Sequence, residues 1–583
     1  MPAKNARSML VVLLILALAA PSLAARPAAD KLVPDSTVVY VCVPNVPELS
    51  KRFLNTAIGR MAQDPQVQPF LKHLYGSMTD FVAKYQDRIG LGLNDILALP
   101  QGELALAVVP QESGPPALIL FLDAGSQLSN ALTLVQKGSE NLEKMGAKKS
   151  EQTIEGTKVT VFEALGRRER TVAWFEKDGT IVAASSIDAI KGVLGLWGGQ
   201  STSGSLAQSS KYTAILARCQ SKEDPAQAYL YIDPIALIRA VGQGQPAAQL
   251  AIALFPTLGL DGLMAAGASL TFDTGHFDSI FHGYLMLENP RGGVFDILAF
   301  KSGDTKPEPW VPSDTATYVT LYFDFDRGFR NFEKLYDSIR GEGSLAGEME
   351  RANQSLGVDI AKEILPQLAG RATLVTRFEG VSASMSPSNT LALKLKNVDE
   401  AAKLLERIYE KNQQGLTTSS AGQNKFYQVQ SGGTPQPDAP PRPTPTFGII
   451  GDYFVVTDRM ESYQKVLQAA SEPGEPLSER LDYKLIASRI QRLANGKKPS
   501  LVRFDRPEVG FRRLHELAMS EAGRERLKKE AERNPLAKTL LDALEANPLP
   551  PFAVFEQYLA PTGGMLIDDE TGLHYTVFSL KRK

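Results

Sequence analysis

The sequence contains little histidine and cysteine, with five His and two Cys among 583 residues. So few soft ligands leave little material for metal clusters, and two cysteines cannot build a disulfide framework. Positive charge is not in excess either, because 63 Lys and Arg stand against 65 Asp and Glu. A protein of this balance has no electrostatic footprint for nucleic acid. We therefore predict no metal, no cofactor and no nucleic-acid partner.

The motifs of common enzyme classes are missing as well. The chain has no phosphate-binding glycine loop, no dinucleotide fingerprint and no nucleophile elbow. His515 begins like a zinc helix, but Met519 occupies the place of the second ligand and cannot replace His. Ser462 and Lys465 have the spacing of a Ser-x-x-Lys nucleophile without the companion motifs of that class. The sequence predicts no catalytic residue and a protein that is not an enzyme.

The composition is that of a soluble globular protein. Charged residues make up 22% and apolar residues 43% of the chain, which excludes a disordered polyelectrolyte and a multi-span membrane protein. At roughly 100–250 residues per domain, the length allows about two to four domains.

The N-terminus has the layout of a secretory signal peptide, which we place at residues 1–25. Lys4 and Arg7 precede the apolar run Met9–Ala20, and a helix break with small residues follows, so we expect cleavage after Ala24. The run is about twelve residues long, shorter than the roughly twenty of a spanning helix. We expect an extracytoplasmic protein, periplasmic or secreted, with no membrane span in the mature chain.

The chain repeats itself. Val33–Val41 recurs as Val311–Val319 with five of nine positions identical, and Lys211–Gln220 corresponds to Asp482–Gln491 with Tyr, Ile, Arg and Gln in register. Several matches in one order at a nearly constant offset indicate an internal duplication.

Each half predicts the same order of elements. A strand and a helical region are followed by two strands, a helix, a hairpin, two further helices, one strand and a closing hairpin. Asp178-Gly179 marks a tight turn within one hairpin. Short turns between paired strands favour an antiparallel sheet. The predicted fold is α+β, a tandem duplication of a domain with a largely antiparallel sheet and packed helices, at 31–305 and 306–583.

Two stretches depart from the repeat. Residues 431–446 are rich in proline, which can neither donate to a strand ladder nor continue a helix, so we predict a solvated loop. Residues 521–548 form a charged helical insertion without a counterpart in the first half. An exposed helix with opposite charges along it is the simplest interpretation, and a partner-binding helix is the alternative.

A few polar residues remain as open candidates. Arg218 and Asp233 recur as Arg489 and Asp505, and we interpret them as caps or as ion pairs within each half; a ligand site is the alternative. Other open alternatives are a metal site at two histidines of one hairpin, aromatic platforms, a basic hairpin loop and a disulfide, at His276 and His282, Tyr212, Tyr229, Tyr231 and Tyr483, Arg167, Arg168 and Arg170, and Cys42 and Cys219.

The motifs of the repeat resemble a known family. Val33-Pro34-Asp35-Ser36-Thr37, Leu99-Pro100-Gln101-Gly102-Glu103 and the Tyr231-Ile232-Asp233-Pro234 turn are similar to an uncharacterised domain of unknown function in secreted bacterial proteins. The resemblance implies export and a repeated α+β architecture, present here as two related halves. It brings no catalytic residue.

The leading functional hypothesis is an exported non-catalytic binding or structural protein of the cell envelope, with an unknown protein or envelope component as partner. Two alternatives stay open. One is an extracytoplasmic, hydrolase-like enzyme whose site is dispersed among loops, and the other is a carrier of an apolar ligand held between helices and sheet.

Overall fold

The computed structural model describes residues 26–582 with several gaps, which are 84–90, 165–169, 201–203, 221–223, 380–385, 423, 431–443 and 472–475. The predicted signal peptide at 1–25 and most of the predicted loop at 431–446 lie outside the described residues. We refer to residues 26–305 as the first half and to 306–582 as the second half.

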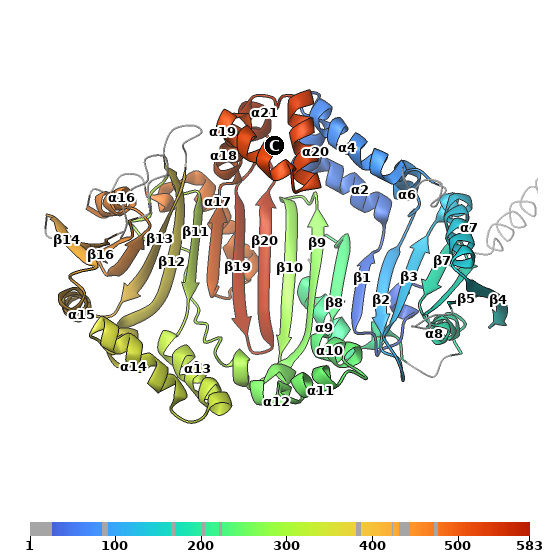
Figure 1. Cartoon of the computed structure of the whole chain (residues 1–583), viewed down its shortest axis with the longest axis horizontal. Helices are drawn as coiled ribbons and strands as arrows, with labels where there is room; N and C mark the ends of the chain where they lie inside the picture. The colour runs from blue at the N-terminus through green and yellow to red at the C-terminus, as the bar shows by residue number, and fades with distance from the viewer. Residues whose placement is uncertain are drawn as a thin grey trace, which may run out of the picture.

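The structure confirms the predicted α+β class with a largely antiparallel sheet (Figure 1). The strands of the first half are β1 (Val39–Val43), β2 (Leu104–Val109), β3 (Ala117–Asp123), β4 (Ala147–Ile154), β5 (Thr157–Ala164), β6 (Arg170–Lys177), β7 (Thr180–Ala184), β8 (Ala228–Ile232), β9 (Leu263–Phe272) and β10 (Phe277–Leu287). Its helices are α2 (Val46–Asn55), α3 (Ala57–Gln63), α4 (Gln68–Ala83), α6 (Leu93–Ala98), α7 (Leu128–Lys144), α8 (Ile187–Trp197), α9 (Ser210–Cys219), α10 (Pro234–Val241), α11 (Pro246–Ala253) and α12 (Phe255–Leu258).

The second half has a parallel set of elements. Its strands are β11 (Thr317–Tyr322), β12 (Leu368–Glu379), β13 (Ser386–Leu395), β14 (Leu416–Ala421), β15 (Asn424–Val429), β16 (Thr446–Ile450), β17 (Tyr453–Thr457), β18 (Leu501–Asp505), β19 (Thr562–Asp569) and β20 (Gly572–Leu580). Its helices are α13 (Phe325–Arg340), α14 (Ser344–Leu356), α15 (Val398–Lys411), α16 (Met460–Ser471), α17 (Leu481–Ala494), α18 (Pro507–Met519), α19 (Glu521–Ala531), α20 (Pro535–Ala546) and α21 (Phe552–Glu556).

Strand pairing follows one order in both halves. The first half pairs its strands as β4-β5-β6-β7-β3-β2-β1-β8-β9-β10. The second half pairs them as β14-β15-β16-β17-β13-β12-β11-β18-β19-β20. All these pairings are antiparallel, and position by position the two orders are identical.

Strands β10 and β20 join the halves into one sheet of twenty strands within the described part of the chain. At this seam Phe281 pairs with Val577 and Gly283 pairs with Tyr575, while His282 lies opposite Thr576 between them. The two halves are thus related by an approximate two-fold axis that passes between His282 and Thr576.

Local sequence explains the matched starts of the helices after the first strand of each half. Asn45 accepts a hydrogen bond from the backbone N–H of Glu48 at 2.9 Å and caps α2, and Asp324 caps α13 through Arg327 at 3.2 Å. The predicted tight turn is also present: Asp178 (φ 53°) and Gly179 (φ 76°) connect β6 to β7 in the left-handed region that such turns require.

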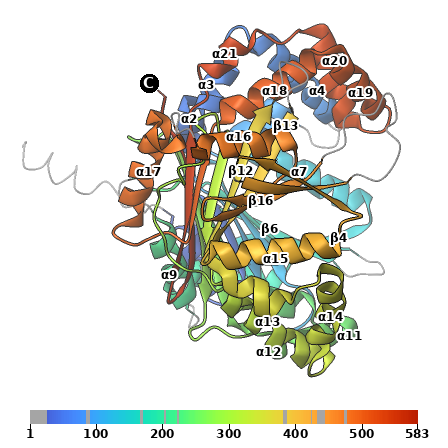
Figure 2. The same ribbon diagram turned by 90° about the vertical axis from the view of Figure 1, so that its left-hand side faces the viewer.

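One face of the sheet is covered by helices, and we call it the covered face. Helices α8 and α9 pack there in the first half and α16 and α17 in the second (Figure 2 shows α9 and α17 on the opposite side from α7 and α15). Glycine allows the closest approach: a Cβ on Gly267 would overlap Ile215 of α9, and a Cβ on Gly563 would overlap Ile486 of α17.

The opposite face carries α7 and α15 over its outer strands, while two groups of helices flank its centre at the strand ends (Figures 1 and 2). One rim consists of α2, α3, α4 and α6 of the first half with α18–α21 of the second. The other rim consists of α10–α12 of the first half with α13 and α14 of the second. Phe552 and Phe555 of α21 cluster with Val67, which lies between α3 and α4. Each rim therefore contains elements of both halves.

A buried ion pair recurs in both halves with its charges exchanged. Arg26 donates to Glu103 at 2.5 Å, and in the second half Arg371 donates to Glu308 at 3.0 Å. Glu103 lies next to Tyr40 of β1, and Glu308 accepts from Tyr318 of β11 at 3.0 Å. Both pairs attach the segment before the first strand of a half to its second strand.

Several elements differ from the predicted order. Strands β4 and β14 were not expected, and the predicted long helical region after β1 is divided into α2, α3 and α4. Helices α19 and α20 occupy most of the predicted insertion at 521–548, but α10–α12 stand in the corresponding place between β8 and β9, where no counterpart was expected. Among the described helices, none combines the length and apolarity needed to cross a membrane.

Candidate functional site

The centre of the flanked face exposes large apolar side chains, and we call this surface the open face. Its members lie on six strands from β3 to β13 and are Val41, Leu106, Leu118, Leu120, Met264, Phe281, Leu285, Leu374 and Leu391. Leu118 is 51% exposed and Leu120 is 42% exposed. Isolated exposed leucines are ordinary, whereas an array of them in the middle of a sheet marks a binding surface.

Strand register shows that these side chains share one face. Leu120 pairs with Leu106, Leu106 with Val41, and Val41 with Leu230. Directly paired residues point to the same side of a sheet. The row continues through Ala268 and across the seam, where small side chains keep the surface shallow.

The second half repeats the row. Leu391 pairs with Leu374, Leu374 with Val319, and Val319 with Arg503. The Arg503 side chain is bound by Asp505 of its own strand at 2.5 Å. From β3 to β13 the surface crosses twelve strands, so at about 4.8 Å per strand it is about 50 Å wide.

Aromatic contacts place the rims on the same side as the open face. Phe53 of α2 meets Phe272 of β9 edge-to-face at 5.6 Å, and the Arg513 guanidinium of α18 lies 5.8 Å from the Phe378 ring of β12. Phe272 and Phe378 stand at even spacing from Leu270 and Leu374 on their strands, and therefore point to the open side. The open face is the floor of a depression between two rows of helices.

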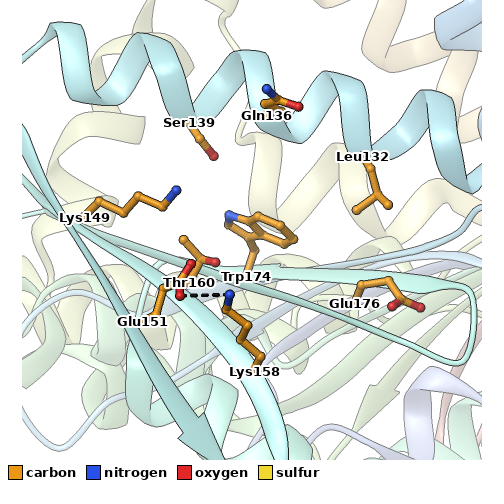
Figure 3. A pocket seen from close by; sticks show the side chains of 9 residues that line it. All are labelled: Leu132, Gln136, Ser139, Lys149, Glu151, Lys158, Thr160, Trp174 and Glu176. Atoms are coloured by element: carbon orange, nitrogen blue, oxygen red, sulfur yellow. Dashed lines mark ion pairs between the residues drawn. The ribbon is translucent and has the colours of Figure 1, made fainter.

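A second hollow lies beside the open face, between α7 and strands β4, β5 and β6 (Figure 3). Its volume is about 440 Å³, and its lining residues are Leu132, Gln136, Ser139, Lys149, Glu151, Lys158, Thr160, Trp174 and Glu176. Figure 3 shows the Trp174 ring between the helix above and the strands below. Lys158 and Glu151 form an ion pair at 2.9 Å. We call this hollow the Trp174 pocket.

The repeated Arg and Asp residues do not pair within the first half. Arg218 donates to Asp569 at 3.0 Å and to Thr571 at 3.1 Å, both in the second half. Asp233 caps α10 through Ala236 and binds Lys211 at 2.5 Å. The capping interpretation is therefore confirmed for Asp233, and the Arg218–Asp233 pair is wrong.

Their second-half counterparts also have separate roles. Asp505 accepts from Arg503 and from the Thr317 hydroxyl at 2.9 Å, and it provides no side-chain cap to α18. Arg489 lies half-buried on α17. Burial alone would raise the pKa of Asp569, but hydrogen bonds from Lys497 and Thr571 and the charge of Arg218 lower it.

The histidines are placed differently from the metal-site alternative. His276 lies in the turn before β10, whereas His282 lies within β10, so the two do not share a strand. The ring beside His282 is that of His574, at 5.4 Å between centroids. His515 bonds the carbonyl of Pro550 at 2.8 Å. Within the described ranges, no group of three or more His, Cys, Asp or Glu side chains could hold a metal ion.

The remaining candidates are structural. Tyr212 packs edge-to-face against Tyr40 and Tyr231, and Tyr483 does the same with Tyr318 and Phe504. The Ser462 hydroxyl bonds that of Ser388.

Both cysteines are free thiols. Cys42 and Cys219 are buried, and burial raises the pKa of the Cys219 thiol to about 12. Of the basic loop, Arg167 and Arg168 lie outside the described residues and Arg170 begins β6.

Sequence reasoning missed both the open face and the Trp174 pocket. A signal for the first was present, because Leu104–Val109 and Ala117–Leu122 are apolar at every position, as in strands buried on both faces. Only the arrangement of the helices shows that one of these faces is uncovered.

Comparison with known proteins gives one match. Residues 28–257 match the profile of a family described as "Protein of unknown function (DUF3352)". No curated protein and no solved structure matches the chain. The family match agrees with the expected resemblance to an uncharacterised domain, and it extends from the segment before β1 into α12.

Proposed function

We propose that this chain is an exported, non-catalytic binding protein of the cell envelope that holds the acyl chains of a lipid on its open face. The observation that carries the proposal is the row of exposed aliphatic side chains on the sheet, which the register places on one surface about 50 Å wide. This choice unites the binding-protein hypothesis with the carrier of an apolar ligand.

The chemistry of the open face favours a lipid over a peptide. Its strands are paired on both sides, so they offer no free backbone groups to which an extended peptide could add. Leu, Val and Phe side chains make no hydrogen bonds that would orient a polar partner. Burying such surface is worth about 25 cal/mol per Å².

The rims can contribute to the same site. Ile58 of α3 and Leu97 of α6 are exposed on one rim, and Ile238 of α10 and Leu250 of α11 are exposed on the other. Amphipathic helices at the border of an apolar floor can cover the sides of a bound chain.

Export and duplication belong to the same proposal. The basic, apolar and small-residue segments within residues 1–25 support a cleaved signal peptide, and N-terminal sequencing of the exported protein should give a chain that starts at Ala25. Identical strand orders and the exchanged ion pair support descent of residues 31–305 and 306–583 from one duplicated α+β unit.

Lipid binding is tested with the purified full chain. Lipids extracted from the protein are identified by mass spectrometry, and binding of a fluorescent phospholipid is measured for wild type, Leu120→Asp and Leu374→Asp. Each carboxylate should weaken binding by about tenfold or more, because a charge beside acyl chains is not solvated. The control is Leu481→Asp, which changes an equally exposed leucine on α17 of the covered side.

Two results would overturn the proposal. One is phospholipid binding that the open-face variants leave unchanged. The other is a dimer in light scattering that dissociates in Leu120→Asp, because the open face would then be covered by a second copy of the chain.

A further inference from the structure

The two halves can be aligned residue by residue through strand register, without reference to their sequences. From Val41 the paired residues run through Leu106, Leu120 and Ala183 to Trp174 on β6. From Val319, the counterpart of Val41, they run through Leu374, Leu391 and Val456 to Phe447 on β16. Trp174 and Phe447 are therefore equivalent positions. One strand further out, Thr160 is equivalent to Tyr427.

In the second half this space is filled by the protein's own aromatic rings. Phe447 stacks on Tyr427 with ring centroids 5.5 Å apart and an angle of 24° between the planes. Tyr409 of α15 lies 5.4 Å from Tyr427 on the other side. Helix and sheet are thus connected by three consecutive rings.

In the first half two of these rings are missing. Counted from the residues that cap the two helices, Gln127 and Asn397, Tyr409 stands at the position of Ser139. The positions of Tyr409 and Tyr427 are thus held by Ser139 and Thr160, which are small and polar. What remains is the pocket of about 440 Å³ with the Trp174 ring at its centre (Figure 3).

The polar lining of the Trp174 pocket is balanced in charge. Lys149 and Lys158 stand against Glu151 and Glu176, and Gln136 adds an amide. Such a set can both donate to and accept from a neutral ligand.

The ring of Trp174 adds a further unsatisfied group. Its Nε1 atom is buried and has no hydrogen-bond partner among the described residues. A buried donor without an acceptor is costly, and a ligand oxygen would satisfy it.

We propose that the Trp174 pocket binds a saccharide, with one sugar ring stacked on Trp174 in the place that Tyr427 and Tyr409 fill in the other half. A sugar ring has an apolar face that matches the indole and hydroxyl groups that match the surrounding carboxylates, ammonium groups and amide. A charged ligand would leave two of the four charged side chains opposed to it. This site is separate from the open face and stands without the lipid proposal.

The experiment titrates the full chain with neutral oligosaccharides of glucose, galactose and N-acetylglucosamine in a calorimeter. Trp174→Ala should weaken binding by about thirtyfold or more, since truncation of a tryptophan at a binding centre has effects of this size. Thr160→Tyr, which copies the second half, should fill the pocket and abolish binding while the melting temperature stays the same or rises.

Ser150→Tyr serves as the matched control, because Ser150 lies on β4 with its exposed side chain on the other face of the sheet from Glu151. It should leave saccharide binding unchanged. The proposal is overturned if no saccharide of the panel binds at millimolar concentration, if Thr160→Tyr binds as well as wild type, or if amino acids or nucleosides bind in place of sugars. None of these outcomes bears on phospholipid binding at the open face.

Discussion

His282 Nδ1 lies 3.2 Å from Oγ1 of Thr576, across the axis that relates the two halves. The ring of His574 adjoins His282 within the same seam, and the Nε2 atoms of both histidines are buried without a partner among the described residues. Burial lowers the pKa of His282 to about 4, with a smaller contribution from His574, and burial also lowers the pKa of His574. The strand pair that joins the halves therefore contains two neutral imidazoles.

This seam predicts a loss of stability in acid. The unfolded chain binds a proton on His282 near pH 6.5, whereas the folded chain does so only near pH 4. The stabilisation is complete above pH 6.5 and is lost as the pH falls to 4, at a cost of up to about 3 kcal/mol.

The measurement is the free energy of unfolding in denaturant at pH 7.5 and at pH 4.5. His282→Gln should flatten the difference between the two values. His276→Gln, at an exposed histidine of the neighbouring turn, should keep it. An unchanged pH dependence in His282→Gln would contradict the assignment to the seam.

Removal of one partner from the buried ion pair of the first half should be strongly destabilising. Glu103→Ala leaves the Arg26 guanidinium, 9% exposed, without its carboxylate, and we expect a loss of about 3–5 kcal/mol in free energy of unfolding. The exchanged double variant Arg26→Glu, Glu103→Arg should regain part of this, because the second half is built that way. Glu48→Ala, which breaks an exposed pair on α2, should cost less than about 1 kcal/mol.

The two glycines beneath the covering helices should not tolerate a methyl group. Gly267→Ala and Gly563→Ala each place a Cβ against an isoleucine of α9 or α17, and we expect losses of about 1–3 kcal/mol in thermal or chemical unfolding. Gly192→Ala on α8 meets no atom within 4 Å and should be neutral or stabilising by up to about 1 kcal/mol. Equal melting temperatures for all three variants would mean that the helices do not approach the sheet this closely.

The contact of Arg218 with the second half can be measured by double-mutant cycles. Arg218→Ala and Asp569→Ala should be non-additive by about 0.5–1 kcal/mol, since the two side chains pair at 3.0 Å and are partly exposed. Arg218→Ala and Asp233→Ala should be additive, because Asp233 binds Lys211 instead. Coupling between Arg218 and Asp233 would support the pairing that the sequence suggested.

The sequence predicted the elements whose pattern is local. The strand at Val38–Val43, the turn at Asp178-Gly179 and the closing hairpins carry apolar runs and turn residues, and they lie where expected. Strand β4 escaped because Lys148–Gln152 is polar on both faces and has no apolar period.

The long-range features left no such pattern. Pairing of Phe281 with Val577 joins positions far apart in the chain, and neither strand reveals its partner. The Trp174 pocket depends on the absence of two rings from the first half, which becomes visible only when register aligns Thr160 with Tyr427. An absent side chain gives no motif for a sequence search.

The outermost strands decide how this protein behaves at high concentration. In the described part of the chain, β4 and β14 are the ends of the sheet, and each pairs on one side only. Unpaired edges of a broad sheet are templates on which further chains can add and form fibrils. Here both edges are polar and exposed, with Lys148–Gln152 on β4 and Thr417–Ser420 on β14. The charges and hydroxyl groups at these edges keep a sheet of twenty strands from growing beyond its own chain.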